Sequence, residues 1–191
     1  MDSEASTRLA MLMEAARAAG GRGPAPVERW SPPDCGDIDM RIDRDGVWHY
    51  AGSPINRPAL VRLFASVLTR EADRYVLVTP AEKVGITVED APFLAVEMAS
   101  EGDVLVFRTN LDDIVRCGPE NRLRFVPEAA GGLRPYVHVR RDLWARLTRA
   151  VYLDLVALAE ERQVDGTAML GIASGAAFFP MAPVSVLEAL A

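Results

Sequence analysis

One basic residue of this chain differs in chemistry from all the others. Lys83 is the only lysine, whereas the remaining 20 basic residues are arginines. Lysine carries a compact, strongly hydrated ammonium, and the planar guanidinium of arginine does not replace it where such a charge is required. Its acidic neighbours in the sequence are Glu82 and Asp90. The segment predicts an ammonium that pairs with one of them or meets the anion of a ligand, and a surface ion pair is the alternative.

Two cysteines and two histidines could together supply four ligands to a zinc ion. No two of them have the short spacing that is typical of zinc-binding motifs. We therefore expect free thiols and hydrogen-bonded histidines, and we expect neither a metal nor a cofactor. The four residues are Cys35, His49, Cys117 and His138.

A row of aspartates superficially suggests a calcium site. These residues are Asp37, Asp39, Asp43 and Asp45, and Arg41 lies where the third carboxylate of a calcium loop would be. No glutamate closes the loop at the required spacing. The row is therefore interpreted as the solvated face of a strand.

Motifs for nucleophilic catalysis and for nucleotide-binding loops are missing from the sequence. Ser174 lies in Gly-x-x-Ser-Gly rather than in the Gly-x-Ser-x-Gly of a nucleophile elbow. Neither Gly-x-x-x-x-Gly-Lys nor Gly-x-Gly-x-x-Gly occurs. Because no set of nucleophile, base and orienting group is visible, we do not expect an enzyme. A small enzyme that uses Lys83 and neighbouring carboxylates is kept as an alternative, as is a protein–protein interaction module.

Charge is unevenly distributed along the 191 residues, whose net charge is −6. A net negative chain is a poor candidate for coating extended duplex DNA, because such binding requires the neutralisation of many phosphates. Residues 34–103 carry 13 acidic and 7 basic residues, whereas residues 116–149 carry 3 acidic residues and 8 arginines. This contrast predicts either docking of oppositely charged segments or an anion site among the arginines, with solvated faces as the alternative.

Hydrophobic periodicity predicts an α+β chain without strand–helix–strand alternation. A strand–turn–strand–helix order occurs twice, which suggests an internal duplication into two similar halves of antiparallel sheet plus helix. The uncharged run 166–187 contains glycines and prolines, so it predicts a strand, a turn and a tail rather than a membrane span. No secretory segment is apparent, and a cytoplasmic location is expected. Helices are predicted near 3–19, 58–70 and 142–161, and strands at 38–43, 47–50, 74–79, 84–88, 93–99, 103–108, 114–117, 123–126 and 136–140.

Several motifs together resemble an uncharacterised bacterial family, domain of unknown function 1285. They span nearly all of residues 35–180, and the N-terminal helix and linker lie outside them. The matching segments are 35–42 (CGDIDMRI), 52–55 (GSPI), 60–64 (LVRLF), 78–83 (VTPAEK), 88–93 (VEDAPF), 108–110 (RTN), 136–140 (YVHVR), 149–152 (RAVY), 174–175 (SG) and 178–180 (FFP).

The resemblance implies a domain duplication whose C-terminal half is superficially like a pleckstrin-homology domain. It also implies a signalling role and a nucleotide-like or nucleic-acid-like ligand at the interface of the two halves. The expected organisation is an N-terminal helix and linker over 1–33, a first repeat over 34–98 and a second repeat over 99–191.

The leading hypothesis is a binding protein with a cleft between its halves, where converging polar groups recognise a small anionic or nucleotide-like ligand. The predicted ligand-binding residues are Asp37, Asp39, Trp48, Arg57, Glu82, Lys83, Asn110 and Arg140.

Overall fold

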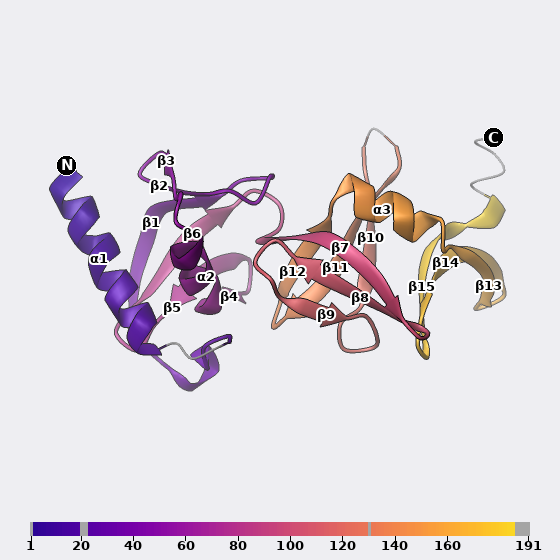
Figure 1. The fold of residues 1–191 in the computed structure, drawn as a ribbon, viewed down its shortest axis with the longest axis horizontal. Helices are drawn as coiled ribbons and strands as arrows, with labels where there is room; N and C mark the ends of the chain where they lie inside the picture. Colours follow the sequence, from indigo (N-terminus) through magenta and orange to yellow (C-terminus); the bar gives the residue numbers. More distant parts are fainter. Residues whose placement is uncertain (1, 20–22, 130, 186–191) are drawn as a thin grey trace. The chain divides into compact units, whose positions relative to one another are not determined.

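The computed structural model describes residues 2–19, 23–129 and 131–185. The chain forms two compact units, Met1–Ala91 (unit 1) and Pro92–Ala191 (unit 2), and each contains a six-stranded sheet (Figure 1). The elements of unit 1 are α1 (Asp2–Ala19), the 3-10 turn η1 (Val27–Arg29), β1 (Asp34–Ile42), β2 (Trp48–Tyr50), β3 (Ser53–Pro54), α2 (Pro58–Ser66), β4 (Leu68–Glu71), β5 (Arg74–Val78) and β6 (Lys83–Val88). Those of unit 2 are β7 (Phe93–Glu101), β8 (Val104–Thr109), β9 (Ile114–Arg116), β10 (Leu123–Pro127), β11 (Leu133–Arg140), β12 (Leu143–Leu147), α3 (Arg149–Val156), β13 (Glu160–Val164), β14 (Thr167–Ser174) and β15 (Ala177–Pro183).

The two six-stranded sheets share one topology, which confirms the predicted duplication. Their strand orders are β3-β2-β1-β6-β5-β4 and β10-β11-β12-β7-β8-β9. Each sheet consists of two three-stranded antiparallel meanders joined at the centre by its first and last strands. That central pair is parallel in both sheets, β1 with β6 and β7 with β12. The expectation of purely antiparallel sheet is therefore wrong at these two pairs.

The helices do not repeat in the way that the sheets do. In unit 1, α2 connects the two meanders, whereas in unit 2 the connection is a turn and α3 follows the completed sheet. The repeated strand–turn–strand–helix order is thus a property of the sequence pattern and not of the architecture. The expected boundary between residues 98 and 99 falls within β7, whose first residue is Phe93.

The predicted long helix over 142–161 is wrong. The segment contains β12, then the short helix α3, and then the start of β13. Leu143 and Leu147 have helical spacing, but with Ala145 they also alternate in the period of a strand. Pairing of β12 with β11 and β7 buries all three side chains on one face of the sheet. Tertiary pairing therefore overrides the local pattern.

The predicted helix over 58–70 is confirmed in its first part only. It ends at Ser66, and β4 begins at Leu68 and pairs antiparallel with β5. The predicted N-terminal helix is confirmed as α1, which buries Leu12 and Ala16. No helix among residues 2–19, 23–129 and 131–185 combines the length and apolar character that crossing a bilayer would demand.

Each unit has its own hydrophobic core. In unit 1, Trp48 stacks on Phe64 of α2 with ring centroids 6.3 Å apart, and both side chains are fully buried. In unit 2, Phe93 and Phe107 of the sheet are fully buried, as is Leu155 of α3. These cores fix the positions of the strands that carry the polar groups described below.

A third sheet, β13-β14-β15, follows α3 in unit 2. Ser174 at the end of β14 attaches it to the six-stranded sheet. The buried Ser174 hydroxyl accepts a hydrogen bond from the Leu105 N–H and donates one to the Cys117 carbonyl, both at 2.9 Å. Ser174 therefore has a structural role, consistent with its failure to match a nucleophile motif.

The β1–β2 hairpin is closed by the side chain of Asp43. Its carboxylate accepts hydrogen bonds from the N–H groups of Asp45 and Val47, each at 2.9 Å, and contacts His49 Nε2 at 2.8 Å. Burial raises the pKa of the Asp43 carboxyl, but these hydrogen bonds outweigh it, so the pKa lies below its ordinary value. The carboxylate therefore stabilises the fold above the unfolded-state pKa, and this contribution is lost as pH falls through the lower folded-state value.

Asp43→Asn is expected to lower the free energy of unfolding at neutral pH by about 0.5–1.5 kcal/mol, the usual contribution of such hydrogen bonds. The difference from the parent should shrink at a pH well below 3.8, where the parent carboxyl, whose pKa lies below that ordinary value, also becomes protonated. Urea unfolding at both pH values measures this. An equal difference at the two pH values would show that the charge of Asp43 is irrelevant to the hairpin.

Candidate functional site

A charged cluster lies on the sheet of unit 1 and comprises Asp34, Asp37, Glu71, Arg74 and Lys83. The Arg74 guanidinium donates to Asp37 Oδ1 through Nε at 3.0 Å and Nη2 at 2.6 Å, and to Asp34 Oδ2 through Nη1 at 2.6 Å. These hydrogen bonds, with that from the Gly36 N–H, hold the pKa of the Asp34 carboxyl below its ordinary value. Arg74 of β5 thus binds both carboxylates of β1 across the intervening strand β6.

Gly85 makes this arrangement possible. It lies on β6 opposite Asp37, where the β1–β6 register is irregular on both sides. A Cβ atom at Gly85 would lie 1.9 Å from Asp37 Oδ1 and 2.4 Å from Arg74 Nε. The missing side chain therefore provides the space in which Arg74 crosses the strand.

Lys83 has a partner that the sequence did not suggest. Its ammonium lies 2.7 Å from Glu71 Oε2, and the lysine side chain is 22% exposed. Glu71 belongs to β4, a strand that was not predicted because residues 58–70 were assigned to a helix. The structure pairs Lys83 with Glu71 and not with the predicted Glu82 or Asp90, so the alternative of a surface ion pair describes it.

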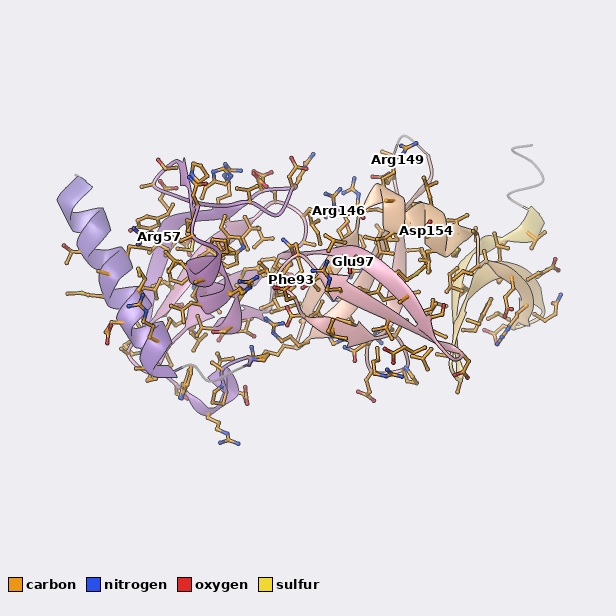
Figure 2. The ribbon with its side chains drawn as sticks, viewed as in Figure 1. Arg57, Phe93, Glu97, Arg146, Arg149 and Asp154 are labelled. Carbon is orange, nitrogen blue, oxygen red and sulfur yellow. The ribbon has the colours of Figure 1, made fainter. Side chains whose placement is uncertain are left out.

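The other predicted site residues of unit 1 occupy different environments. Trp48 is in the core, and its indole N–H is buried without an acceptor among the described residues. Glu82 lies where α1 packs on the sheet, beside Leu12 of the helix, in a gap too narrow to admit a water molecule. Asp39 on β1 is exposed, and so is Arg57 at the start of α2, which Figure 2 labels.

The two predicted site residues of unit 2 both surround the start of β7. The Asn110 side-chain oxygen accepts a hydrogen bond from the Leu94 N–H at 3.0 Å, so it continues the hydrogen bonding between β8 and β7 beyond the end of β8. Arg140 Nη1 lies 2.5 Å from Asp113 Oδ1, and its guanidinium lies 4.8 Å from the centre of the Phe93 ring. The structure therefore brings Asn110 and Arg140 to consecutive residues of one strand, and it places Asp37 and Lys83 in one charged cluster.

A second polar surface of unit 2 was not predicted as a site. We call it the arginine–aromatic face, and it comprises Arg124, Tyr136, His138 and Trp144. Arg124 is directly opposite Tyr136 on the next strand, and His138 is opposite Trp144. The Arg124 guanidinium lies 4.3 Å from the centre of the Trp144 ring and 5.1 Å from that of Tyr136. Both rings are buried, whereas Arg124 is exposed.

The face continues toward the end of the β10–β11 hairpin. Val126 pairs with Arg134 two residues beyond Arg124 and Tyr136, so all four side chains share one side of the sheet. An open hollow of about 390 Å³ is lined there by Val126, Arg134 and Glu128, among others. Arg134 forms an ion pair with Glu128. The hollow therefore has a cationic and an apolar wall beside the stacked guanidinium.

A strand alternation could have identified this face. Arg124 and Val126 occupy one side of a predicted strand, and Tyr136 and His138 occupy one side of another. Trp144 was missed because 142–161 was assigned to a helix, which gives Trp144 different neighbours. In the structure, the Trp144 indole N–H donates a hydrogen bond to Asp142 Oδ1 at 3.2 Å.

His138 and Cys117, two further reactive side chains of unit 2, form hydrogen bonds within the protein. His138 directs Nδ1 at the Glu120 carbonyl at 3.0 Å and Nε2 at the Arg141 carbonyl. Burial raises the pKa of the Cys117 thiol to about 11, although a hydrogen bond with Ser174 opposes the shift. Within residues 2–19, 23–129 and 131–185, no three Cys, His, Asp or Glu side chains are grouped so that they could hold a metal ion.

Comparison with known proteins places this chain in a family. Residues 25–91 match the model described as "Domain of unknown function (DUF1285), N-terminal domain", and residues 92–181 match "Protein of unknown function (DUF1285), C-terminal domain". No curated protein matches the chain.

Two solved structures are similar to it. The crystal structure of a DUF1285 family protein from Silicibacter pomeroyi DSS-3 is 49% identical with a TM-score of 0.82, over 93% of this chain and 97% of that one. A DUF1285 family protein from Shewanella baltica OS155 is 29% identical with a TM-score of 0.52, over 63% of this chain and 91% of that one. The two family matches meet between Ala91 and Pro92, where the structure also divides, and the chain belongs to the DUF1285 family.

Proposed function

We propose that this protein is a ligand-binding protein for an anionic, nucleotide-like molecule, and that the arginine–aromatic face contributes to its site. The observation that supports the proposal is the exposed Arg124 guanidinium stacked over the buried rings of Trp144 and Tyr136. A guanidinium held over aromatic rings can still donate its N–H groups to a phosphate in bidentate fashion. The open side of such a plane also stacks on a nucleobase.

Within the described part of the chain, ion pairs neutralise several arginines of residues 116–149, but not Arg124. Arg116, Arg134 and Arg140 are paired with Glu101, Glu128 and Asp113, respectively. Arg124 contacts two aromatic rings, and no described carboxylate neutralises it. Part of the positive excess in this segment is therefore consumed by internal ion pairs, whereas Arg124 keeps its charge for an external anion.

The enzymatic alternative has less support. Lys83 is paired with Glu71, and the carboxylates of Asp34 and Asp37 are bound by Arg74, so these groups neutralise one another. A general base needs a free lone pair within reach of its substrate. The charged cluster is better explained as a set of structural ion pairs that connects β1, β4, β5 and β6.

The biological setting is part of the same proposal. We place the protein in the cytoplasm and in signal transduction, with ligand binding as its input. A pleckstrin-homology-like character of unit 2 stays a prediction, and the parallel β7–β12 pair is a feature that such a comparison must accommodate.

Calorimetric titration of the full chain with AMP, adenosine and inorganic phosphate tests the proposal. AMP is expected to bind most tightly, and its affinity should fall as salt rises because phosphate contacts release counterions. Arg124→Met should weaken AMP binding by about tenfold or more, the loss of one charge-assisted contact. Arg124→Lys should recover only part of it, because the ammonium does not present a planar fork.

Arg116→Met is the matched control, since Arg116 is exposed and already paired with Glu101 on another edge of the sheet. It should bind AMP as the parent does. Equal affinity for AMP and adenosine, or unchanged AMP binding by Arg124→Met, would refute the proposed role of this face. Failure of the parent to bind any of the three probes would refute the nucleotide-like class.

A further inference from the structure

The third sheet of unit 2 ends on an open strand. β13 is at one edge of the order β13-β14-β15, and its residues Glu160 to Gln163 are all exposed. Within residues 2–19, 23–129 and 131–185, no strand pairs with its outer side. An open edge presents a row of N–H and C=O groups that can pair with another chain.

The six-stranded sheets of this protein show that two such meanders can pair edge to edge, although their central pairs are parallel. Each six-stranded sheet consists of two three-stranded meanders joined through one strand of each (Figure 1). The third sheet is a single three-stranded meander, so it corresponds to half of such a sheet. A second copy of the same meander would complete it without any new element.

The hairpin geometry identifies the backbone groups that face outward. The β13–β14 turn has two residues, Asp165 and Gly166, with φ of 51° and 79°, between the paired Val164 and Thr167. Residues that flank such a two-residue turn exchange hydrogen bonds with each other, and the pattern alternates along the strand. Arg162 and Glu160 therefore direct their backbone groups toward β14, whereas Glu161 and Gln163 direct theirs to the open edge.

Charge then selects one register for a two-fold antiparallel pair. Centring the pair on Arg162 places two guanidinium groups opposite each other, and centring it on Gln163 places Glu161 opposite Asp165. Centring it on Glu161 places Glu160 of each copy opposite Arg162 of the other. Opposite charges in such cross-strand positions stabilise a sheet, and like charges destabilise it. The two Glu160–Arg162 pairs therefore outweigh the repulsion between the two Glu161 side chains, which face each other on the opposite side of the sheet.

Within one copy, Glu160 and Arg162 are already close enough to take part in these cross-strand ion pairs. Arg162 Nε lies 2.6 Å from Glu160 Oε1, and the guanidinium lies 5.0 Å from the centre of the Phe178 ring. Two copies in the Glu161-centred register would form a ring of four alternating charges. Charged side chains on an edge strand usually prevent pairing, but here their alternation is self-complementary.

Three exposed apolar side chains lie in α3 and in the segment that joins it to β13, and we call them the α3 patch. Helix α3 leads directly into β13, and Leu153, Val156 and Leu158 are 58%, 38% and 47% exposed. Figure 2 labels Asp154 on this helix, one residue after Leu153. Grouped exposed apolar side chains mark interaction surfaces, and these lie within a few residues of the open strand.

We propose that two copies of this chain associate through β13, which pairs antiparallel with β13 of the second copy and extends the third sheet to six strands. Glu160 of each copy faces Arg162 of the other, and the α3 patch is covered at the same interface. The backbone hydrogen bonds and the apolar area supply the affinity, and the charges set the register.

Sedimentation equilibrium of the full chain over a concentration series tests this interface. The parent should form a dimer. Arg162→Glu places like charges at both cross-strand positions and should raise the dimer dissociation constant by about tenfold or more. The double variant Glu160→Arg with Arg162→Glu restores both pairs and should return the constant close to that of the parent. Glu161→Gln removes the one repulsive contact and should tighten the dimer.

Glu161→Pro tests strand pairing independently of register. It removes an N–H that β14 does not use, so the monomer should fold, as circular dichroism can verify, while the dimer is lost. Arg116→Glu, on the edge strand β9, is the control and should leave the dimer intact. A parent that stays monomeric throughout the series, or a dimer that Arg162→Glu and Glu161→Pro leave unchanged, would overturn the proposal.

Discussion

Replacement of Trp48 by alanine is expected to lower the free energy of unfolding by about 3–5 kcal/mol, the usual cost of truncating a large buried aromatic side chain. Trp48 is 1% exposed and stacks on Phe64 with an interplanar angle of 22°. Alanine would remove the larger ring of this pair and leave a cavity between β2 and α2. Urea unfolding followed by circular dichroism measures the effect.

Trp48→Phe should cost much less. The Trp48 indole N–H has no acceptor among the described residues, so phenylalanine keeps most of the apolar contact and breaks no hydrogen bond. Trp144→Phe is the matched comparison, because the Trp144 indole donates to Asp142 at 3.2 Å. If Trp48→Phe destabilised the protein as much as Trp48→Ala, the indole N–H would have to serve an important hydrogen bond.

Gly171→Ala is expected to destabilise the protein by about 1–3 kcal/mol, the range for inserting a methyl group into a packed site. A Cβ atom at Gly171 would lie 2.5 Å from Phe178 Cζ and 2.6 Å from the Phe179 carbonyl oxygen. The ring of Phe178 could turn away, but the carbonyl belongs to the backbone of the paired strand β15. Accommodation of the methyl group therefore requires β14 and β15 to separate, at the point where their register already shifts.

Gly118→Ala is the control for this substitution. Gly118 has no atom within 4 Å of the added Cβ, and its φ lies outside the left-handed region. Its free energy of unfolding should be close to that of the parent. Equal stability of Gly171→Ala and Gly118→Ala would contradict the close approach of β15 to Gly171.

Local patterns predicted most of the individual elements. The predicted strands at 38–43 and 47–50 are found as β1 and β2, and the helix predicted from residue 58 begins there as α2. These features depend on the conformational preferences of a few adjacent residues, which the sequence contains directly. The family motifs spread over residues 35–180 likewise predicted the duplication, which the two sheets confirm.

The same patterns could not distinguish between alternatives that differ only in tertiary pairing. Leu143 and Leu147 satisfy both a helical and a strand period. The pairing of Leu143 with Arg140 and of Leu147 with Ala95 made the segment a strand. Leu68 continues the hydrophobic spacing of α2, yet it pairs with Leu77 of β5 and belongs to the sheet. In both cases, backbone hydrogen bonds to distant residues decide the conformation.

The candidate sites show the same division. The sequence by itself determined that Lys83 is unique, that residues 116–149 are rich in arginine, and that no metal or nucleophile motif is present. The tertiary structure decided which charges neutralise one another: Lys83 with Glu71, and Arg74 with Asp34 and Asp37. It also placed Arg124 over Trp144, 20 positions away in the chain, without a carboxylate partner among the described residues. Charge pairing and ring stacking act over a few ångströms in space, whereas the sequence records only separation along the chain, so the register of the sheets had to be known first.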